Sequence, residues 1–385
     1  MINRTLECKI RKLADSFSVI ILTGPRQSGK TTLSRMVFPD YEYINLEDIA
    51  VCQAVAADPH AFLLQHGRGI IIDEAQKLPE LFSYVQVVVD NHPDYRYLLT
   101  GSNNFMLMEK ITQSLAGRAA VLTLLPLSLA ELRGASDYTT DQLMLRGGYP
   151  AIWATSKKPF DVYSNYYTTY IERDVHQIVN LREFAVFQQF ITLVAGRVGT
   201  ILNAAALSAE LGVSSVTINH WMGVLETSYL IFRIPPYFRN IGKRILKSPK
   251  IYFYDTGLAC YLMGINTVEQ LAVHPLRGQL FENMVVSEFM KRHYNKGNQR
   301  PHLYFYRDSQ QKEVDIVEEE TFRQLRAYEI KSARNYNSSF GAGLVYFRKL
   351  FGDEVVSTQV LYDGDDEMPD ARIGYRNIRS FFIEG

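Results

Sequence analysis

The stretch Gly24-Pro25-Arg26-Gln27-Ser28-Gly29-Lys30-Thr31 decides the fold of the N-terminal part of this chain. The apolar residues 19–22 directly before it predict a short buried strand, and residues 31–37 after it predict a helix. The pattern is G-x-x-x-x-G-K-[ST], whose glycines let the backbone fold into a nest of amides that point at phosphate oxygens. Strand, loop and helix in this order predict a P-loop that binds a nucleoside triphosphate.

The residues of this loop carry separate expectations. We expect Lys30 to reach the β- and γ-phosphates and the hydroxyl of Thr31 to ligate Mg²⁺. The guanine-reading motif N/T-K-x-D does not occur in this part of the sequence, which favours ATP over GTP. The expected nucleotide-binding residues form one run: Gly24, Pro25, Arg26, Gln27, Ser28, Gly29, Lys30, Thr31 and Thr32.

A second apolar segment, residues 69–72, predicts a strand that ends in two carboxylates. We expect Asp73 to hold Mg²⁺, directly or through water, and Glu74 to act as the general base that polarises the attacking water. Two acids after a strand are common in α/β proteins, so the pair alone is a weak signal. Downstream of a complete P-loop it becomes a strong one.

Two further positions are candidates for sensing the γ-phosphate. Residues 95–100 predict a third strand, and Thr100, Ser102 and Asn103 at its end are candidate sensors, of which we favour Ser102. A simple polar turn explains these residues equally well. Arg118 is a candidate arginine finger, acting in cis or from a neighbouring subunit, although a surface arginine is the more ordinary explanation.

Composition limits the classes of protein. A chain of 385 residues predicts two or three domains, and the balance of 41 basic against 41 acidic side chains gives no global field to attract nucleic acid. The three cysteines, Cys8, Cys52 and Cys260, lack C-x-x-C spacing and indicate reduced thiols rather than disulfides or zinc. No run approaches the roughly 20 apolar residues that span a bilayer, so we expect a cytoplasmic protein without a membrane partner.

Residues 204–226 have the spacing of a helix-turn-helix with Gly212 at the tight turn. The second helix is expected to expose polar side chains that hydrogen-bond base edges: Ser214, Ser215, Thr217, Asn219 and His220. A stretch without acidic residues follows and contains Arg233, Arg239, Lys243, Arg244, Lys247 and Lys250. We predict a winged helix whose basic wing binds double-stranded DNA. Packing of the helix pair against protein remains the alternative.

The C-terminal part contains a D…E-x-K arrangement. Asp315 lies in one predicted strand and Glu329-x-Lys331 in the next, and strand alternation puts Glu329 and Lys331 on the same face. Two such carboxylates bind Mg²⁺ in metal-dependent nucleases, with the lysine positioning water, and Glu282 from a preceding helix can add a ligand. Retention of this scaffold for binding alone remains open.

Several of these motifs, taken together, resemble the prokaryotic AAA-type P-loop ATPases whose C-terminal half is a domain of unknown function. The resemblance is carried by Gly24-Pro25-Arg26-Gln27-x-Gly29-Lys30-Thr31-Thr32, Ile72-Asp73-Glu74-Ala75-Gln76, Leu99-Thr100-Gly101-Ser102, Gly147-Gly148-Tyr149-Pro150, Tyr170-Ile171-Glu172-Arg173-Asp174, Lys250-Ile251-Tyr252-Phe253-Tyr254-Asp255-Thr256-Gly257-Leu258, Glu282-Asn283 and Glu313-Val314-Asp315.

This resemblance implies an α/β fold with four parts. We expect an AAA-type P-loop ATPase domain with a parallel sheet at 1–140, a helical lid or linker at 141–200, a winged helix at 201–265 and a PD-(D/E)xK nuclease-like domain, similar to restriction endonucleases, at 266–385. The leading hypothesis is a Mg²⁺-dependent ATPase that acts as a DNA-associated switch or remodeller. The alternatives are an ATP-regulated metal-dependent nuclease and a nucleotide-gated homo-oligomer that does not bind DNA.

Overall fold

The computed structural model describes residues 2–102, 114–132, 134–171, 184–240, 242, 247–369 and 371–384. Asn103, Lys243, Arg244 and residues 172–174, all singled out above, lie outside the described residues. The chain divides into two compact units. Unit 1 comprises Met1–Leu127, Thr227–Tyr229 and Lys291–Gln299, and unit 2 comprises Ser128–Glu226, Leu230–Met290 and Arg300–Gly385. The four domains expected from the sequence, and the three boundaries between them, stay predictions.

Unit 1 is built on a five-stranded parallel sheet of order β2-β3-β4-β1-β5. Strands β1, β3 and β4 are buried along their whole length, as expected for a parallel sheet covered on both faces. The expected α/β fold with an N-terminal parallel sheet is confirmed. The strands are β1 (Val19–Thr23), β2 (Glu42–Asn45), β3 (Ile70–Asp73), β4 (Tyr97–Thr100) and β5 (Ala119–Thr123).

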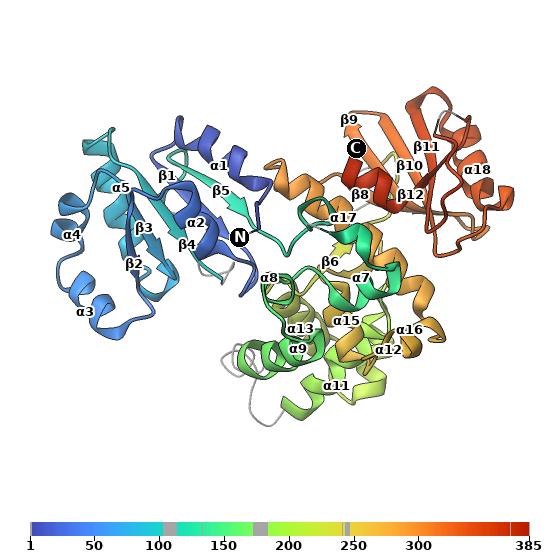
Figure 1. The fold of residues 1–385 in the computed structure, drawn as a ribbon, viewed down its shortest axis with the longest axis horizontal. Helices are drawn as coiled ribbons and strands as arrows, with labels where there is room; N and C mark the ends of the chain where they lie inside the picture. The colour runs from blue at the N-terminus through green and yellow to red at the C-terminus, as the bar shows by residue number, and fades with distance from the viewer. Residues whose placement is uncertain are drawn as a thin grey trace. The chain divides into compact units, whose positions relative to one another are not determined.

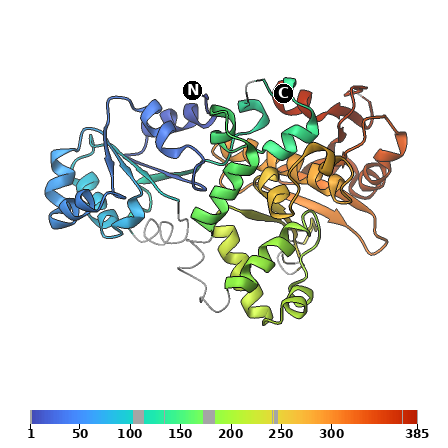
Figure 2. The same ribbon diagram turned by 60° about the horizontal axis from the view of Figure 1, so that its bottom comes forward.

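Side-chain alternation along β1 divides the core of unit 1 into two layers. Val19 and Ile21 face the cluster that includes Val55, Leu63 and Val85 of α3, α4 and α5. Ile20 and Leu22 face the opposite cluster with α1 and α2 (Figure 1, Figure 2). These helices are α1 (Leu6–Ala14), α2 (Lys30–Val37), α3 (Ile49–Ala57), α4 (Pro59–Gln65) and α5 (Leu81–Asn91).

The first half of unit 2 is largely helical. Gly212 takes a left-handed conformation (φ 67°) between α12 and α13, as a tight turn between two helices requires. Trp221 of α13 packs against Phe187 and Phe190 of α11, with ring centroids 5.4 and 5.3 Å apart. The helices are α7 (Thr140–Arg146), α8 (Pro150–Ala154), α9 (Pro159–Tyr166), α11 (Phe184–Ala195), α12 (Ala204–Leu211), α13 (Ser215–Thr227), α15 (Thr256–Leu262) and α16 (Val268–Ala272).

An antiparallel pair of strands, β6 (Ile231–Ile234) and β7 (Lys250–Phe253), follows α13. The segment after β6 pairs with β8, because Phe305 N donates to Pro235 O at 3.1 Å and Tyr237 N donates to Phe305 O at 2.6 Å. The β6–β7 hairpin is therefore hydrogen-bonded to the C-terminal sheet.

The C-terminal sheet has the order β12-β11-β10-β9-β8. Strands β8, β9 and β10 form an antiparallel meander, whereas β11 and β12 run parallel to β10. Its elements are α17 (Arg277–Asn295), β8 (Leu303–Arg307), β9 (Glu313–Thr321), β10 (Gln324–Lys331), α18 (Ala342–Phe351), β11 (Val355–Tyr362) and β12 (Gly374–Asn377). Among all described residues, no helix is both long enough and apolar enough to cross a bilayer.

Candidate nucleotide site and the C-terminal carboxylate cluster

The P-loop leaves the sheet at the C-terminal end of β1, and its glycines are required by geometry. Gly24 has φ +138°, and a Cβ there would lie 2.2 Å from the carbonyl oxygen of Leu124. Gly29, the residue before α2, has φ +95°. Side chains at these two positions would strain the backbone, so the loop needs glycine to curl back on itself.

Lys30 begins α2 and is folded back over the loop. Its Nζ donates to Gly24 O at 3.0 Å and to Pro25 O at 2.8 Å, and the residue is 6% exposed. Burial lowers the pKa of this ammonium from 10.5 to about 8, although Glu74 and Asp73 act in the opposite direction. A buried ammonium whose hydrogen bonds go to two carbonyl oxygens is well suited to take a phosphate group as its counter-ion.

Asp73 ends β3 and is 5% exposed. Its Oδ2 accepts from Thr31 Oγ1 at 2.7 Å and from Tyr43 OH at 2.8 Å, and its Oδ1 accepts from Thr100 Oγ1. The structure therefore brings the two expected Mg²⁺ ligands, Thr31 and Asp73, within hydrogen-bond distance of each other.

Glu74 follows in a left-handed conformation with φ 56°, which turns its side chain away from the strand direction. Its Oε2 accepts from Gln76 Nε2 at 2.5 Å and from Ser102 Oγ at 3.4 Å. Ser102 thus lies beside the expected general base, and Thr100 lies beside the expected metal ligand. The catalytic roles of these residues stay predictions.

The residues of this site fit a nucleoside triphosphate with Mg²⁺. Ser28 Oγ in the loop is buried without a hydrogen-bond partner in the described structure, as is expected of a group that lies against a bound anion. The loop curls back on itself at its glycines, and the buried ammonium of Lys30 supplies a positive charge for the phosphates. Thr31 and Asp73 supply the ligands that a metal ion bound to the triphosphate needs.

Arg118 lies at the end of the strands opposite to the P-loop. It directly precedes β5, and the parallel register pairs Ala119 with Val19, the first residue of β1, whereas the P-loop follows the last residue of β1. Its guanidinium forms a two-point ion pair with Asp90, at 2.5 and 2.8 Å. The cis form of the arginine-finger prediction is wrong, because the length of β1 separates Arg118 from its own loop. The trans form stays a prediction.

Two residues of the site were missed by the sequence analysis. Arg4 donates from Nη1 to Ser28 O at 2.8 Å and from Nη2 to Leu125 O at 2.7 Å, which ties the loop to the chain after β5. A single arginine before a helix has no pattern that marks it. Tyr43, the second residue of β2, donates to Asp73, and only the pairing of β2 with β3 in the structure reveals this contact.

A buried tyrosine hydroxyl lies behind the loop. Tyr229 is 5% exposed, and its OH lies 2.9 Å from Oγ1 of Thr23, the residue before Gly24. Thr23 Oγ1 also lies 3.1 Å from Thr123 Oγ1. This small hydroxyl cluster within unit 1 fixes the end of β1 from which the P-loop starts.

In unit 2 the structure brings together the carboxylates expected of a nuclease-like site. Asp315 Oδ2 of β9 accepts from Ile330 N at 2.7 Å, and Glu329 Oε1 of β10 accepts from Lys331 Nζ at 2.6 Å. Burial raises the pKa of Glu329 to about 8, and Asp315 adds to the shift. Within the described ranges, no set of three or more Asp, Glu, His or Cys side chains is arranged to hold a metal ion.

Glu282 of α17 is engaged by a lysine. Its Oε1 accepts from Lys250 Nζ at 3.0 Å and from Tyr252 OH at 2.6 Å, and Lys250 Nζ also lies 2.6 Å from Glu313 Oε1. Burial opposes the charge of Lys250, but Tyr252 and the carboxylates of Glu282, Asp315 and Glu313 raise its pKa well above the ordinary value. The expectation that Lys250 belongs to an exposed basic wing is wrong, because the residue is 4% exposed.

Other expected DNA contacts are also engaged within unit 2. Arg233 pairs with Glu226, and Arg239 Nη2 lies 3.1 Å from Glu354 Oε1. Ser214 Oγ accepts from Thr217 N at 3.0 Å and so caps α13. The exposed polar side chains of α13 are Ser215, Asn219 and His220.

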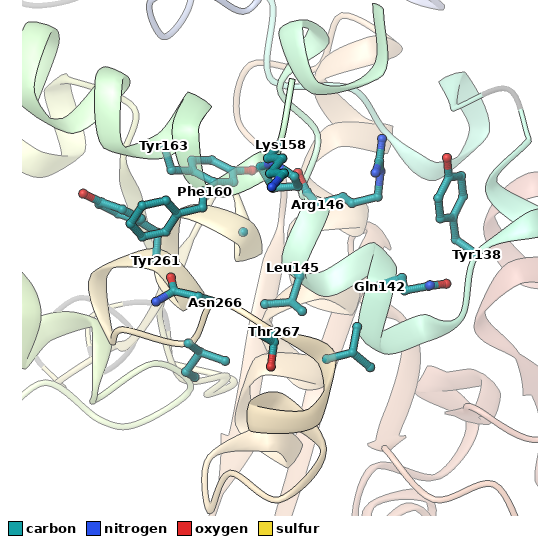
Figure 3. Close-up of a pocket in the computed structure, with 14 residues that line it drawn as sticks. Tyr138, Gln142, Leu145, Arg146, Lys158, Phe160, Tyr163, Tyr261, Asn266 and Thr267 are labelled. Atoms are coloured by element: carbon teal, nitrogen blue, oxygen red, sulfur yellow. The ribbon is translucent and has the colours of Figure 1, made fainter. Parts of the chain in front are cut away.

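Unit 2 also holds a cavity of about 290 Å³ beside α7, α9 and α15 (Figure 3). Phe160, Tyr163 and Tyr261 line it. The OH of Tyr163 donates to Asp255 Oδ1 at 2.6 Å, and Gly148 N donates to Asp255 Oδ2 at 2.6 Å. The Gly147-Gly148-Tyr149-Pro150 motif and the motif that contains Asp255 are therefore parts of one buried network that supports this wall.

Comparisons with known proteins divide the chain into three matched segments. An AAA domain matches residues 16–133, and two domains of unknown function match residues 138–269 (DUF8612) and 277–379 (DUF4143). A Walker-type ATPase of Pyrococcus abyssi superposes with a TM-score of 0.45 at 14% identity, over 68% of this chain and 96% of that one.

Two uncharacterized proteins, from Mycobacterium bovis and Mycobacterium tuberculosis, are each 31% identical to this chain in an alignment 373 residues long that covers 95% of this chain and 81% of the relative. The matched segment includes the P-loop, the acidic strand and the C-terminal carboxylates. The chain belongs to the family of these mycobacterial proteins, and its N-terminal part is an AAA-type P-loop domain that binds nucleotide.

Proposed function

We propose that this protein binds ATP with Mg²⁺ at the P-loop and hydrolyses it. We further propose that the state of the bound nucleotide switches the rest of the chain between two states. The observation that carries the proposal is the 2.7 Å hydrogen bond between Thr31 and Asp73, which joins the P-loop helix to the acidic strand. Thr31 and Asp73 would hold Mg²⁺, which would supply charge neutralisation at the phosphates.

The remaining side chains divide the work of hydrolysis. Lys30 exchanges the carbonyls of Gly24 and Pro25 for phosphate oxygens, which relieves the cost of its burial. Glu74 takes the proton of the attacking water, and Gln76 and Ser102 orient its carboxylate. ATP is preferred over GTP because no guanine-reading motif is present in the N-terminal sequence.

The experiment is steady-state phosphate release from ATP by the full chain. Lys30→Ala is expected to abolish both nucleotide binding and turnover, whereas Lys77→Ala, at an exposed lysine after β3, is expected to leave both unchanged. Equal rates for the wild type and Lys30→Ala would refute hydrolysis at this site.

We also propose that α12, α13 and the β6–β7 hairpin act as a winged helix that meets DNA. The exposed polar face of α13, with Ser215, Asn219 and His220, supports this proposal. Because Arg233 and Arg239 are paired and Lys250 is buried, the interaction should have few phosphate contacts and a shallow dependence on salt.

This half of the proposal is tested by measuring ATP turnover and DNA binding with double- and single-stranded DNA at several salt concentrations. Stimulation of turnover by duplex DNA, lost in Asn219→Ala, supports it. If DNA does not change the rate of ATP turnover and the molecular mass changes with the bound nucleotide, the DNA-binding proposal is refuted. The result would instead indicate a nucleotide-gated homo-oligomer.

A further inference from the structure

A lysine from the β6–β7 hairpin lies among the carboxylates that the sequence assigns to a metal. Lys250 Nζ is 3.0 Å from Glu282 Oε1 and 2.6 Å from Glu313 Oε1. The same Glu282 oxygen accepts from Tyr252 OH at 2.6 Å. One of the two oxygen atoms with which Glu282 would ligate a cation, Oε1, is thus already shared between an ammonium and a phenol.

The position of Lys250 is fixed by the fold. All four residues of β7 are buried, and the segment that leaves β6 is hydrogen-bonded to Phe305 of β8 on both sides. The ammonium also lies 5.6 Å from the centre of the Phe305 ring. A side chain packed in this way does not leave the cluster without loss of the hairpin's contacts with β8.

Electrostatic repulsion also favours an ammonium over a divalent metal ion in this cluster. A divalent cation held by Glu282 and Asp315 needs carboxylate oxygens about 2.0–2.6 Å away. The Lys250 ammonium is already 3.0 Å from Glu282 Oε1, so such a cation would lie within a few ångströms of a positive charge in a buried site. Like charges this close and this poorly solvated repel strongly. Lys331 adds a second ammonium, 2.6 Å from Glu329 Oε1.

We propose that the Lys250 ammonium is the resident cation of this cluster and takes the place that a divalent metal would occupy in the nuclease-like site expected from the sequence. The C-terminal sheet is then a scaffold that does not cleave nucleic acid, and Lys250 ties the β6–β7 hairpin to α17 and β9. The nuclease-like residues Glu282, Asp315, Glu329 and Lys331 are structural in this account.

The test measures thermal unfolding of the full chain, without nucleotide, in EDTA and in MnCl₂. Lys250→Met keeps the length of the side chain but removes its charge, and it should lower the midpoint in EDTA by about 6 °C or more, since it removes the ammonium that the carboxylates of Glu282 and Glu313 share. Mn²⁺ should restore this loss in Lys250→Met but not in the double variant Lys250→Met/Glu282→Gln. The control is Lys247→Met, an exposed lysine between β6 and β7, which should behave like the wild type.

The P-loop site is the same in all these variants, so its own response to Mn²⁺ cancels in the comparison. Failure of Mn²⁺ to restore Lys250→Met would overturn the proposal. If Lys250→Met does not fold, calorimetric titration of the wild type and Asp315→Asn with Mn²⁺ decides. Equal binding by the two proteins supports a site closed by lysine, and a binding event that Asp315→Asn removes contradicts it.

Discussion

The hydroxyl of Thr31, in the first turn of α2, donates to Asp73 Oδ2 at the end of β3 across 2.7 Å. This hydrogen bond links the helix that follows the P-loop to the strand that carries the acidic pair. It holds together two groups that are 42 residues apart in the sequence. In the proposed account, these two groups are the protein ligands of Mg²⁺.

Thr31→Val should slow ATP hydrolysis roughly 10- to 100-fold, because it removes one metal ligand worth about 1.4–3 kcal/mol. Asp73 keeps its bonds to Tyr43 and Thr100, so the fold should lose only about 1 kcal/mol of stability. Phosphate release and urea unfolding measure the two effects. Unchanged turnover in Thr31→Val would remove this residue from the site.

Lys30→Met should make the nucleotide-free protein more stable at pH 7 by on the order of 1 kcal/mol, because the charge is buried and the wild type gains only two hydrogen bonds to carbonyls in return. The folded state holds the pKa of Lys30 at about 8, below the unfolded value of 10.5.

The unfolded wild type therefore binds more protons than the folded one between these two values. Its stability relative to Lys30→Met should rise as pH increases from about 8 to about 10.5 and stay level below pH 8. Urea unfolding of both proteins across this range checks the sign. A difference that does not vary with pH would show that burial does not perturb Lys30.

Gly24→Ala and Gly223→Ala should have opposite effects. At Gly24 the new Cβ would lie 2.2 Å from Leu124 O at φ +138°, so the loop must distort and nucleotide binding should be lost. At Gly223, inside α13, nothing lies within 4 Å of the Cβ, and alanine should stabilise the helix by about 0.5–1 kcal/mol. Nucleotide titration and urea unfolding of the two variants test this contrast.

Asp255→Ala should destabilise unit 2 by about 3 kcal/mol or more, since it leaves the buried amides of Gly148 and Leu258 without their acceptor and removes a buried hydrogen bond of Tyr163, whose OH keeps only Arg146 O. Asp161→Ala, at an exposed position of α9, is the matched control and should cost less than about 0.5 kcal/mol. Chemical unfolding compares them, and similar losses in both variants would show that the Asp255 network contributes little.

The structure brings Thr31 and Asp73 together as the sequence analysis expected, and the sequence signals for both residues are local. The P-loop and the acidic pair Asp73-Glu74 each lie where a strand ends, and parallel strands bring their carboxyl ends to the same side of the sheet. The sequence could not decide whether Arg118 acts in cis, since only the register of β5 against β1 shows that it lies at the opposite end of these strands from the P-loop.

Lys250 illustrates a different limit of prediction from sequence. In the sequence it closes a basic stretch, which is typical of a solvated wing, but its carboxylate partners lie 32 and 63 residues further along the chain. A buried ion pair of this kind depends on tertiary packing, which spacing does not reveal. Arg4 and Tyr229 were invisible for the same reason, because their partners in the P-loop region are far away in the sequence.

The most direct measurement of the central claim is a pair of assays on Glu74→Gln: equilibrium binding of ATP and single-turnover phosphate release. The account predicts that the variant binds ATP as tightly as the wild type but releases phosphate at least roughly 100-fold more slowly, because only the general base is lost. Release at the wild-type rate by Glu74→Gln would contradict hydrolysis at the edge formed by β1, β3 and β4.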